Sequence, residues 1–218
     1  MRPIIVHPHE NVAATLSEAA VLFAQHGLGV VPTETFYGIA ARADSAVAVG
    51  KIAALKQRDN DPARKAIALL ADTLETVVNH FVLEWPLSAL ASHFWPGPLT
   101  MALQPQSQML PELTAQDGTV GVRVSASPLT CRLAAAAGGL MTATSANLAH
   151  GQPCVDVRDL AEGVREYVDF IVDDGPCQGG APSTVMGLRE NRVVVYRSGA
   201  ISNQSLANVL GYGPSLYT

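Results

Sequence analysis

The sequence has few charged residues, and its acidic residues outnumber its basic ones. Charged residues make up 15% of the 218 residues, and the formal net charge is −5. A protein that coats nucleic acid is usually basic, so any contact with a polyanion must come from a local patch. Hydrophobic residues make up 48% of the chain, which excludes an intrinsically disordered protein and predicts a large core.

Three further absences narrow the class of protein. No apolar run reaches the roughly 18 residues that a membrane span needs, and the first residues lack the layout of a signal peptide. The patterns G-x-x-x-x-G-K-[ST] and G-x-G-x-x-G are missing, which excludes P-loop and Rossmann modes of nucleotide binding. No histidines or cysteines have metal-ligand spacing, so we expect no structural zinc.

The chain has only three cysteines, which is an odd number. Cys131, Cys154 and Cys177 contain no C-x-x-C pair. We therefore expect free thiols in a reducing compartment, which predicts a cytoplasmic protein. A catalytic thiol is the alternative, and it is uncommon for this cysteine pattern.

Helix and strand patterns interleave along the chain. The first helix should begin after Asn11 and stop at Gly27. Helices are expected over 11–27, 44–58, 128–139 and 202–211. Strands are expected over 28–33, 66–71, 98–104, 119–125, 140–146, 169–175, 183–188 and 192–199. Some strands follow one another directly, which predicts a mixed sheet with helices packed on it. No linker-like tract interrupts the pattern, so one domain over 1–218 is the simplest organisation.

The strand over 119–125 alternates between two kinds of side chain. Its three valines face one way and should pack in the core, whereas the other face carries Arg123 between Gly121 and Ser125. Small residues around a single arginine leave room for an anionic ligand, because arginine holds a carboxylate or phosphate through two parallel hydrogen bonds. An ordinary surface arginine is the alternative.

Short polar side chains also stand at strand ends. Ser145 and Asn147 follow the strand over 140–146, and open sheets place ligands at the ends of their strands. A capped turn is the alternative interpretation of these two residues. Ser183 opens a later strand, and Arg197 precedes a glycine turn.

Basic residues are concentrated in one segment. Lys56, Arg58, Arg64 and Lys65 fall within ten residues of a chain that has 14 lysines and arginines. They predict either a phosphate clamp or a solvated run of charge. We expect Lys56 and Arg58 to be exposed at a helix end.

The order of these segments is more specific than any one of them. PTETFYG is followed by K-x-R, WPGPLT, GVRV, TSAN, STV and R-x-GAI, within residues 12–202. In this series the chain resembles the YrdC/TsaC family, the threonylcarbamoyl-AMP synthases. The resemblance implies an α+β, three-layer α/β fold: a YrdC-like twisted mixed β-sheet flanked by helices, with a deep concave basic cleft.

The resemblance also implies a reaction and its site. Such enzymes make L-threonylcarbamoyladenylate and pyrophosphate from L-threonine, bicarbonate and ATP, with Mg²⁺ on the ATP phosphates, for threonylcarbamoyladenosine modification of tRNA. The residues implied for ATP are Thr35, Lys56, Arg58, Thr119, Ser145, Asn147 and Arg197, of which Lys56 and Arg58 are the implied catalytic pair. The residues implied for threonine and bicarbonate are Thr33, Lys65, Arg123 and Ser183. The threonines of PTET would then be ligand contacts rather than turn formers.

Departures from the family pattern leave alternatives open. Lys65-Ala66-Ile67 stands where Lys-Pro-Leu is common, Pro182 stands in place of a glutamate, and Ser198 in place of a proline. One alternative is a YrdC-like paralogue that acts on another carbamoyl compound. Another is a non-catalytic protein that binds double-stranded RNA or tRNA through the cleft. We expect partner proteins from tRNA modification, no membrane contact and no further C-terminal domain.

Overall fold

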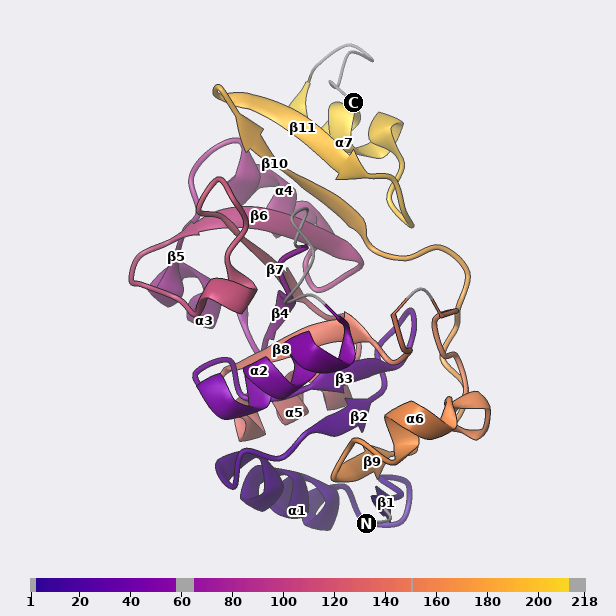
Figure 1. Cartoon of the computed structure of the whole chain (residues 1–218). Coiled ribbons are helices and arrows are strands. Elements are labelled where there is room, and N and C mark those ends of the chain that lie inside the picture. The colour runs from indigo at the N-terminus through magenta and orange to yellow at the C-terminus, as the bar shows by residue number, and fades with distance from the viewer. Residues whose placement is uncertain (1–2, 58–64, 150, 212–218) are drawn as a thin grey trace.

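The computed structural model describes residues 3–57, 65–149 and 151–211, which form a mixed sheet with helices on both faces (Figure 1). Its strands are β1 (Ile4–Val6), β2 (Gly29–Val31), β3 (Gly38–Ala40), β4 (Ala68–Ala71), β5 (Phe81–Val82), β6 (Leu99–Pro105), β7 (Val120–Val124), β8 (Leu140–Ser145), β9 (Phe170–Val172), β10 (Thr184–Arg189) and β11 (Arg192–Arg197). Its helices are α1 (Val12–Ala24), α2 (Ala46–Leu55), α3 (Leu74–His80), α4 (Leu87–Phe94), α5 (Pro128–Ala136), α6 (Glu162–Arg165) and α7 (Asn203–Leu210), with 3-10 turns at η1 (Pro111–Leu113) and η2 (Val157–Asp159).

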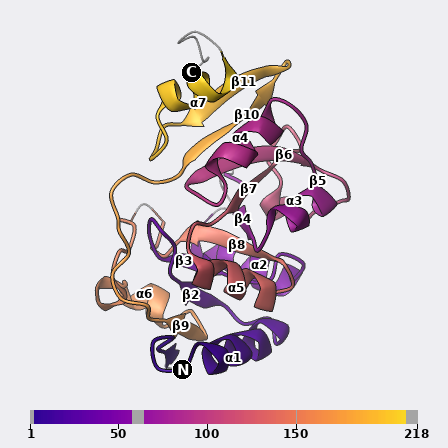
Figure 2. The same ribbon diagram turned by 180° about the vertical axis from the view of Figure 1, so that it is seen from behind.

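The strands form one twisted sheet in the order β1-β9-β2-β3-β8-β4-β7-β6-β10-β11, with β5 beside β6. The sheet contains parallel pairs such as β4 with β7 and antiparallel pairs such as β6 with β7, so the predicted mixed sheet is confirmed. The molecule is elongated, with α1 at one end and α7 at the other (Figures 1 and 2). None of the described helices is both long and apolar enough to cross a membrane.

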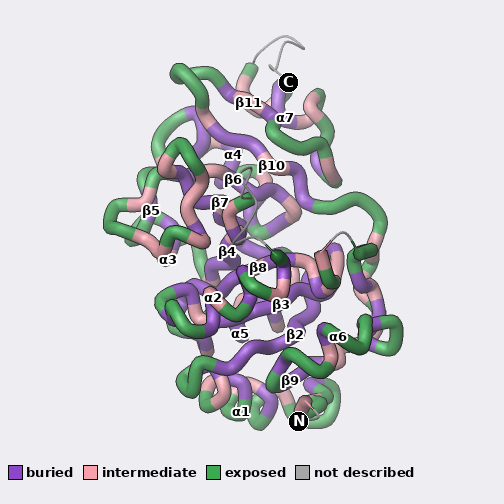
Figure 3. Tube along the Cα trace, viewed as in Figure 1, coloured by how far each residue is buried: buried purple, intermediate pink, exposed green. Residues whose placement is uncertain are grey.

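Adjacent residues of the central strands enter different cores, one on each face of the sheet. Val30 and Leu69 belong to a core that α2, α3 and α4 cover. Val31 and Leu70, the next residues along β2 and β4, belong to a second core under α1 and α5. The predicted three-layer arrangement is therefore confirmed. In Figure 3 the buried parts of the trace follow the central strands between these helices.

Helix α1 begins as predicted but ends differently. The Asn11 side chain accepts a hydrogen bond from Ala14 N at 3.0 Å, which caps the helix. At the other end His26, and not Gly27, takes the left-handed conformation, with φ of 62°. The amide of Gly27 donates to Leu22 O at 2.8 Å, and a Cβ on Gly27 would lie 2.7 Å from that oxygen. Glycine is needed there for space rather than for backbone angle.

Candidate active site

The turn after β2 carries a largely buried acid, Glu34, that pairs with the arginine of β7. Arg123 Nη1 donates to Glu34 Oε1 at 2.8 Å, and the hydroxyl of Ser125 donates to the other carboxylate oxygen. The two charged side chains are 8% and 13% exposed. The valines of β7 lie in the core on the opposite face, as the alternation predicted. Arg123 is therefore a buried charge, which excludes the alternative of an ordinary surface arginine.

The groups around Arg123 have opposing effects on the pKa of its guanidinium. Burial lowers the pKa of the Arg123 guanidinium, Glu34 raises that pKa, and the neighbouring guanidinium of Arg197 lowers it. An arginine remains charged at neutral pH in spite of such effects. Among the described residues the bond to Glu34 is the one hydrogen bond that Arg123 makes, which leaves four of its five N–H donors for a ligand.

A row of polar side chains continues from Arg123 across the next strands. Thr100 Oγ1 of β6 lies 2.9 Å from Ser183 Oγ, at the start of β10. Arg197 Nη2, at the end of β11, donates to Ser183 Oγ at 3.0 Å and to Ser183 O at 2.8 Å. Val185 pairs with both Thr100 and Arg197 in the sheet register, so the row follows from strand order. Thr100 was not among the predicted site residues.

The two threonines around Glu34 shape the turn that holds it. Thr33 Oγ1 accepts hydrogen bonds from the amides of Thr35 at 3.1 Å and Phe36 at 3.2 Å, and it donates to Phe36 O at 2.7 Å. The expectation that these threonines are not turn formers is therefore wrong for Thr33. A side-chain oxygen that accepts from the backbone two residues on replaces the glycine or asparagine of a usual turn.

Lys56 joins the end of α2 to the end of β8. Its ammonium donates to Ser145 O at 2.7 Å, and to Asn147 O and Asn147 Oδ1 at 2.6 Å each. Lys56 is 9% exposed, so the prediction that it is exposed at a helix end is wrong. The carbonyl oxygens of the turn after β8 need a donor, and the lysine supplies it. The structure thus brings three predicted residues into one cluster.

Two further predicted residues in the described part of the chain, Thr119 and Lys65, make no hydrogen bond to these clusters. Thr119 donates to Asp117 Oδ1 at 2.6 Å, at the opposite end of β7 from Arg123, about 13 Å away at the rise of a strand. Lys65 is exposed ahead of β4. Arg58 and Arg64 lie outside the described residues. A cavity of about 520 Å³ is lined by residues 43–44, 80, 107–111, 137–138 and 140, none of which was predicted for the site. The basic cleft stays a prediction.

This twisted sheet between two helical layers, with polar side chains gathered at the ends of its strands, defines a YrdC-like α/β protein. A family model for Sua5, YciO and YrdC proteins, described as telomere recombination, matches residues 22–199. The chain belongs to this family. Its relatives include proteins named threonylcarbamoyl-AMP synthase.

Two of these relatives show how far the similarity extends. The threonylcarbamoyl-AMP synthase of Bacillus subtilis is 31% identical over 197 residues, which cover 90% of this chain and 56% of that protein. The one from Chromohalobacter salexigens is 30% identical over 186 residues, which cover 85% of this chain and 98% of that protein. The chain therefore spans about half of the first relative and nearly all of the second.

Two solved structures resemble the fold over nearly the whole chain. Sua5 of Pyrococcus abyssi, complexed with L-threonine, superposes with a TM-score of 0.83 at 28% identity, covering 97% of this chain and 61% of that one. YciO of Escherichia coli superposes with a TM-score of 0.82 at 22% identity, covering 93% and 98%. The second likeness shows the fold alone.

Proposed function

We propose that the chain is a threonylcarbamoyl-AMP synthase, a nucleotidyltransferase that makes L-threonylcarbamoyladenylate from L-threonine, bicarbonate and ATP and releases pyrophosphate. Family membership and the relatives of that name support the proposal. The product would serve the threonylcarbamoyladenosine modification of tRNA in the cytoplasm, together with partner proteins.

The observation that carries the proposal is the buried guanidinium of Arg123. Glu34 takes one of its donors, and in the described part of the chain no other acceptor takes the rest. A buried charge with unfilled donors favours an anionic ligand, because each unfilled donor costs free energy. The α-carboxylate of L-threonine is an anion that accepts two parallel hydrogen bonds from arginine.

The hydroxyls beside Arg123 would orient the rest of the amino acid. Ser183 is 9% exposed, and its hydroxyl already contacts Thr100 and Arg197. A hydroxyl both donates and accepts, so Ser183 suits the threonine hydroxyl as well as its carboxylate. Arg197 is held by Ser183 at the far end of the row, where its charge would face bicarbonate or the phosphates of ATP.

The reaction asks mainly for positioning and positive charge. The amine nitrogen of L-threonine bonds to the carbon of bicarbonate, and water leaves, which gives a carbamate. A carbamate oxygen then bonds to the α-phosphorus of ATP while the bond to pyrophosphate breaks. Ser145 and Asn147 would contact the nucleotide, Lys56 would hold their turn and add its positive charge, and Arg58 would be a second cation. Oriented donors of this kind stabilise a phosphoryl-transfer transition state without a covalent intermediate.

Magnesium would arrive with the phosphates of ATP. Within the residues that the structure describes, no three histidine, cysteine, aspartate or glutamate side chains gather where they could hold a metal ion. Glu34 already accepts from Arg123 and from Ser125. The donor set does not fit a metal held by protein side chains, whereas Mg²⁺ commonly keeps phosphate and water ligands.

The proposal is tested by pyrophosphate release from the purified chain, with each substrate left out in turn. We expect release that requires ATP, L-threonine and bicarbonate together. Release that needs a different carbamoyl compound would support the paralogue instead. Binding of tRNA in a folded chain that releases no pyrophosphate would support the RNA-binding alternative.

A further inference from the structure

Glu34 and Arg123 form a pair without net charge inside the proposed site. Both side chains are nearly buried, at 13% and 8% exposed, and Arg123 Nη1 lies 2.8 Å from Glu34 Oε1. Ser125 donates to the second carboxylate oxygen, so the acid is fixed from two sides. The acid also stands between two threonines whose hydroxyls lie 3.1 Å apart in the same turn. The pair is therefore a built arrangement of charge rather than a mobile contact.

A buried arginine without this acid would prefer the most highly charged anion in reach. The cleft that we propose must bind ATP and release pyrophosphate, and both carry more negative charge than the carboxylate of an amino acid. Arginine forms bidentate hydrogen bonds with phosphate as readily as with carboxylate. The guanidinium of Arg123 alone would therefore not favour the carboxylate of the amino acid over a phosphate.

The carboxylate of Glu34 reverses that preference. It lies against Arg123, so a phosphate that approaches the guanidinium meets a negative charge at short range. A zwitterionic amino acid meets a complementary pair instead, because its carboxylate can face Arg123 while its ammonium faces Glu34. Oε1 of Glu34 accepts from Arg123 and Oε2 accepts from Ser125, and each oxygen has a second acceptor position.

We propose that Glu34 is a specificity-determining residue, which makes Arg123 select a zwitterionic amino acid and exclude phosphoryl groups. The identity of the amino acid, L-threonine, rests on the proposed function. The exclusion of phosphate does not, because it follows from the charges of the pair. Phosphates would then be directed toward Lys56 and the turn after β8.

The test is calorimetric titration of inorganic pyrophosphate into three folded proteins. Glu34→Gln keeps the size of the side chain and an oxygen for Arg123, but it removes the negative charge. We expect it to bind pyrophosphate about tenfold more tightly than the natural chain, or at an additional site. Glu34→Asp keeps the charge and is the matched control, with pyrophosphate binding like that of the natural chain. Equal pyrophosphate binding in the natural chain and Glu34→Gln would overturn the proposal.

A second pair of variants assigns the effect to Arg123. In Glu34→Gln combined with Arg123→Met, the gained affinity for pyrophosphate should disappear. Arg123→Lys alone should leave pyrophosphate binding unchanged, because it keeps a positive charge beside Glu34 and the proposal excludes phosphate from this position in the natural chain. A clear loss of pyrophosphate affinity in this single variant would overturn the proposal. This measurement also tests the proposal if Glu34→Gln does not fold. Circular dichroism verifies the fold of each variant.

These titrations need no catalysis, so the two proposals fail separately. A natural chain that releases no pyrophosphate from ATP, L-threonine and bicarbonate would refute the proposed function. The comparison of Glu34→Gln with Glu34→Asp would still show whether the acid keeps phosphate away from Arg123.

Discussion

Arg123 Nη1 of β7 donates to Glu34 Oε1 at 2.8 Å, across 89 positions of the sequence. This bond fixes the turn after β2 against the end of β7 and buries both charges. Removing one partner of such a pair leaves the other buried without compensation, so both residues are constrained by the fold as well as by any ligand.

The first prediction concerns the geometry of Arg123. Arg123→Lys keeps a positive charge but cannot present two parallel donors to a carboxylate. We expect the dissociation constant for L-threonine to rise about tenfold or more, with ATP binding unchanged. Calorimetry with each ligand measures both. Arg132→Lys, at an exposed position of α5, is the matched control. Undiminished L-threonine binding in Arg123→Lys would remove this residue from the amino-acid site.

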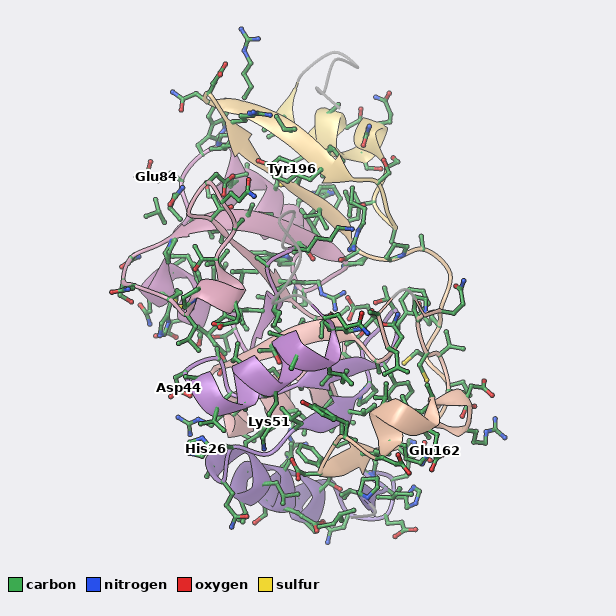
Figure 4. The ribbon with its side chains drawn as sticks, in the orientation of Figure 1. His26, Asp44, Lys51, Glu84, Glu162 and Tyr196 are labelled. Atoms are coloured by element: carbon green, nitrogen blue, oxygen red, sulfur yellow. The ribbon has the colours of Figure 1, made fainter. Side chains whose placement is uncertain are left out.

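The second prediction concerns the hydrogen bonds that Lys56 donates to the turn after β8. Lys56→Met leaves the carbonyl groups of Ser145 and Asn147 without this donor, and we expect a loss of about 2–4 kcal/mol in the free energy of unfolding. Urea denaturation measures the loss. Lys51→Met is the control, since Lys51 is exposed on the same helix (Figure 4). Equal unfolding midpoints for the two variants would show that the cluster does not stabilise the fold.

The third prediction concerns the glycine after Arg197 and Ser198. A Cβ on Gly199 would lie 2.2 Å from Pro182 O and 2.6 Å from Thr184 N, which are backbone atoms. Gly199→Ala should therefore destabilise the chain by about 2 kcal/mol or more. Gly50→Ala is the contrasting variant, because nothing lies within 4 Å of its Cβ position in α2. It should stabilise by roughly 0.5–1 kcal/mol. Thermal unfolding followed by circular dichroism compares them, and a Gly199→Ala variant as stable as the natural chain would contradict the close packing.

The fourth prediction concerns the pH dependence of the thiols. Burial raises the pKa of each of Cys131, Cys154 and Cys177 above the usual value of a thiol. The thiolate is the reactive form, so a raised pKa means less thiolate at a given pH. We expect slow alkylation by iodoacetamide at pH 8 that accelerates as the pH rises. Mass spectrometry should show faster alkylation at pH 8 in urea. Equal rates for the native and unfolded chain would contradict the burial.

Much of the sheet could be predicted from the sequence because its strands carry local signals. The alternation in β7 and the apolar run of β2 are visible without any partner strand, and both strands were predicted. The short helices α3 and α4 were not predicted. Their ends depend on packing against the sheet, and seven or eight residues carry too few helical repeats to be recognised.

The site could be predicted only as a set of residue types. The sequence indicated that Arg123 lies on a face with small neighbours, but not that Glu34 would reach it from the turn after β2. Lys56 was expected in solvent because lysine rarely lies buried unless it is paired, and its partners are mostly backbone oxygens that no residue type reveals. Such contacts depend on strand order, which local patterns do not encode.

The most direct test of the central claim is the identity of the product. The chain should be incubated with ATP, L-threonine and ¹³C-labelled bicarbonate, and the adenylates should be separated and weighed by mass spectrometry. We predict an adenylate with the mass of threonylcarbamoyl-AMP that carries one ¹³C from bicarbonate and disappears when L-threonine is omitted. Hydrolysis of ATP without any labelled adenylate, in a chain that binds both ATP and L-threonine, would contradict the account.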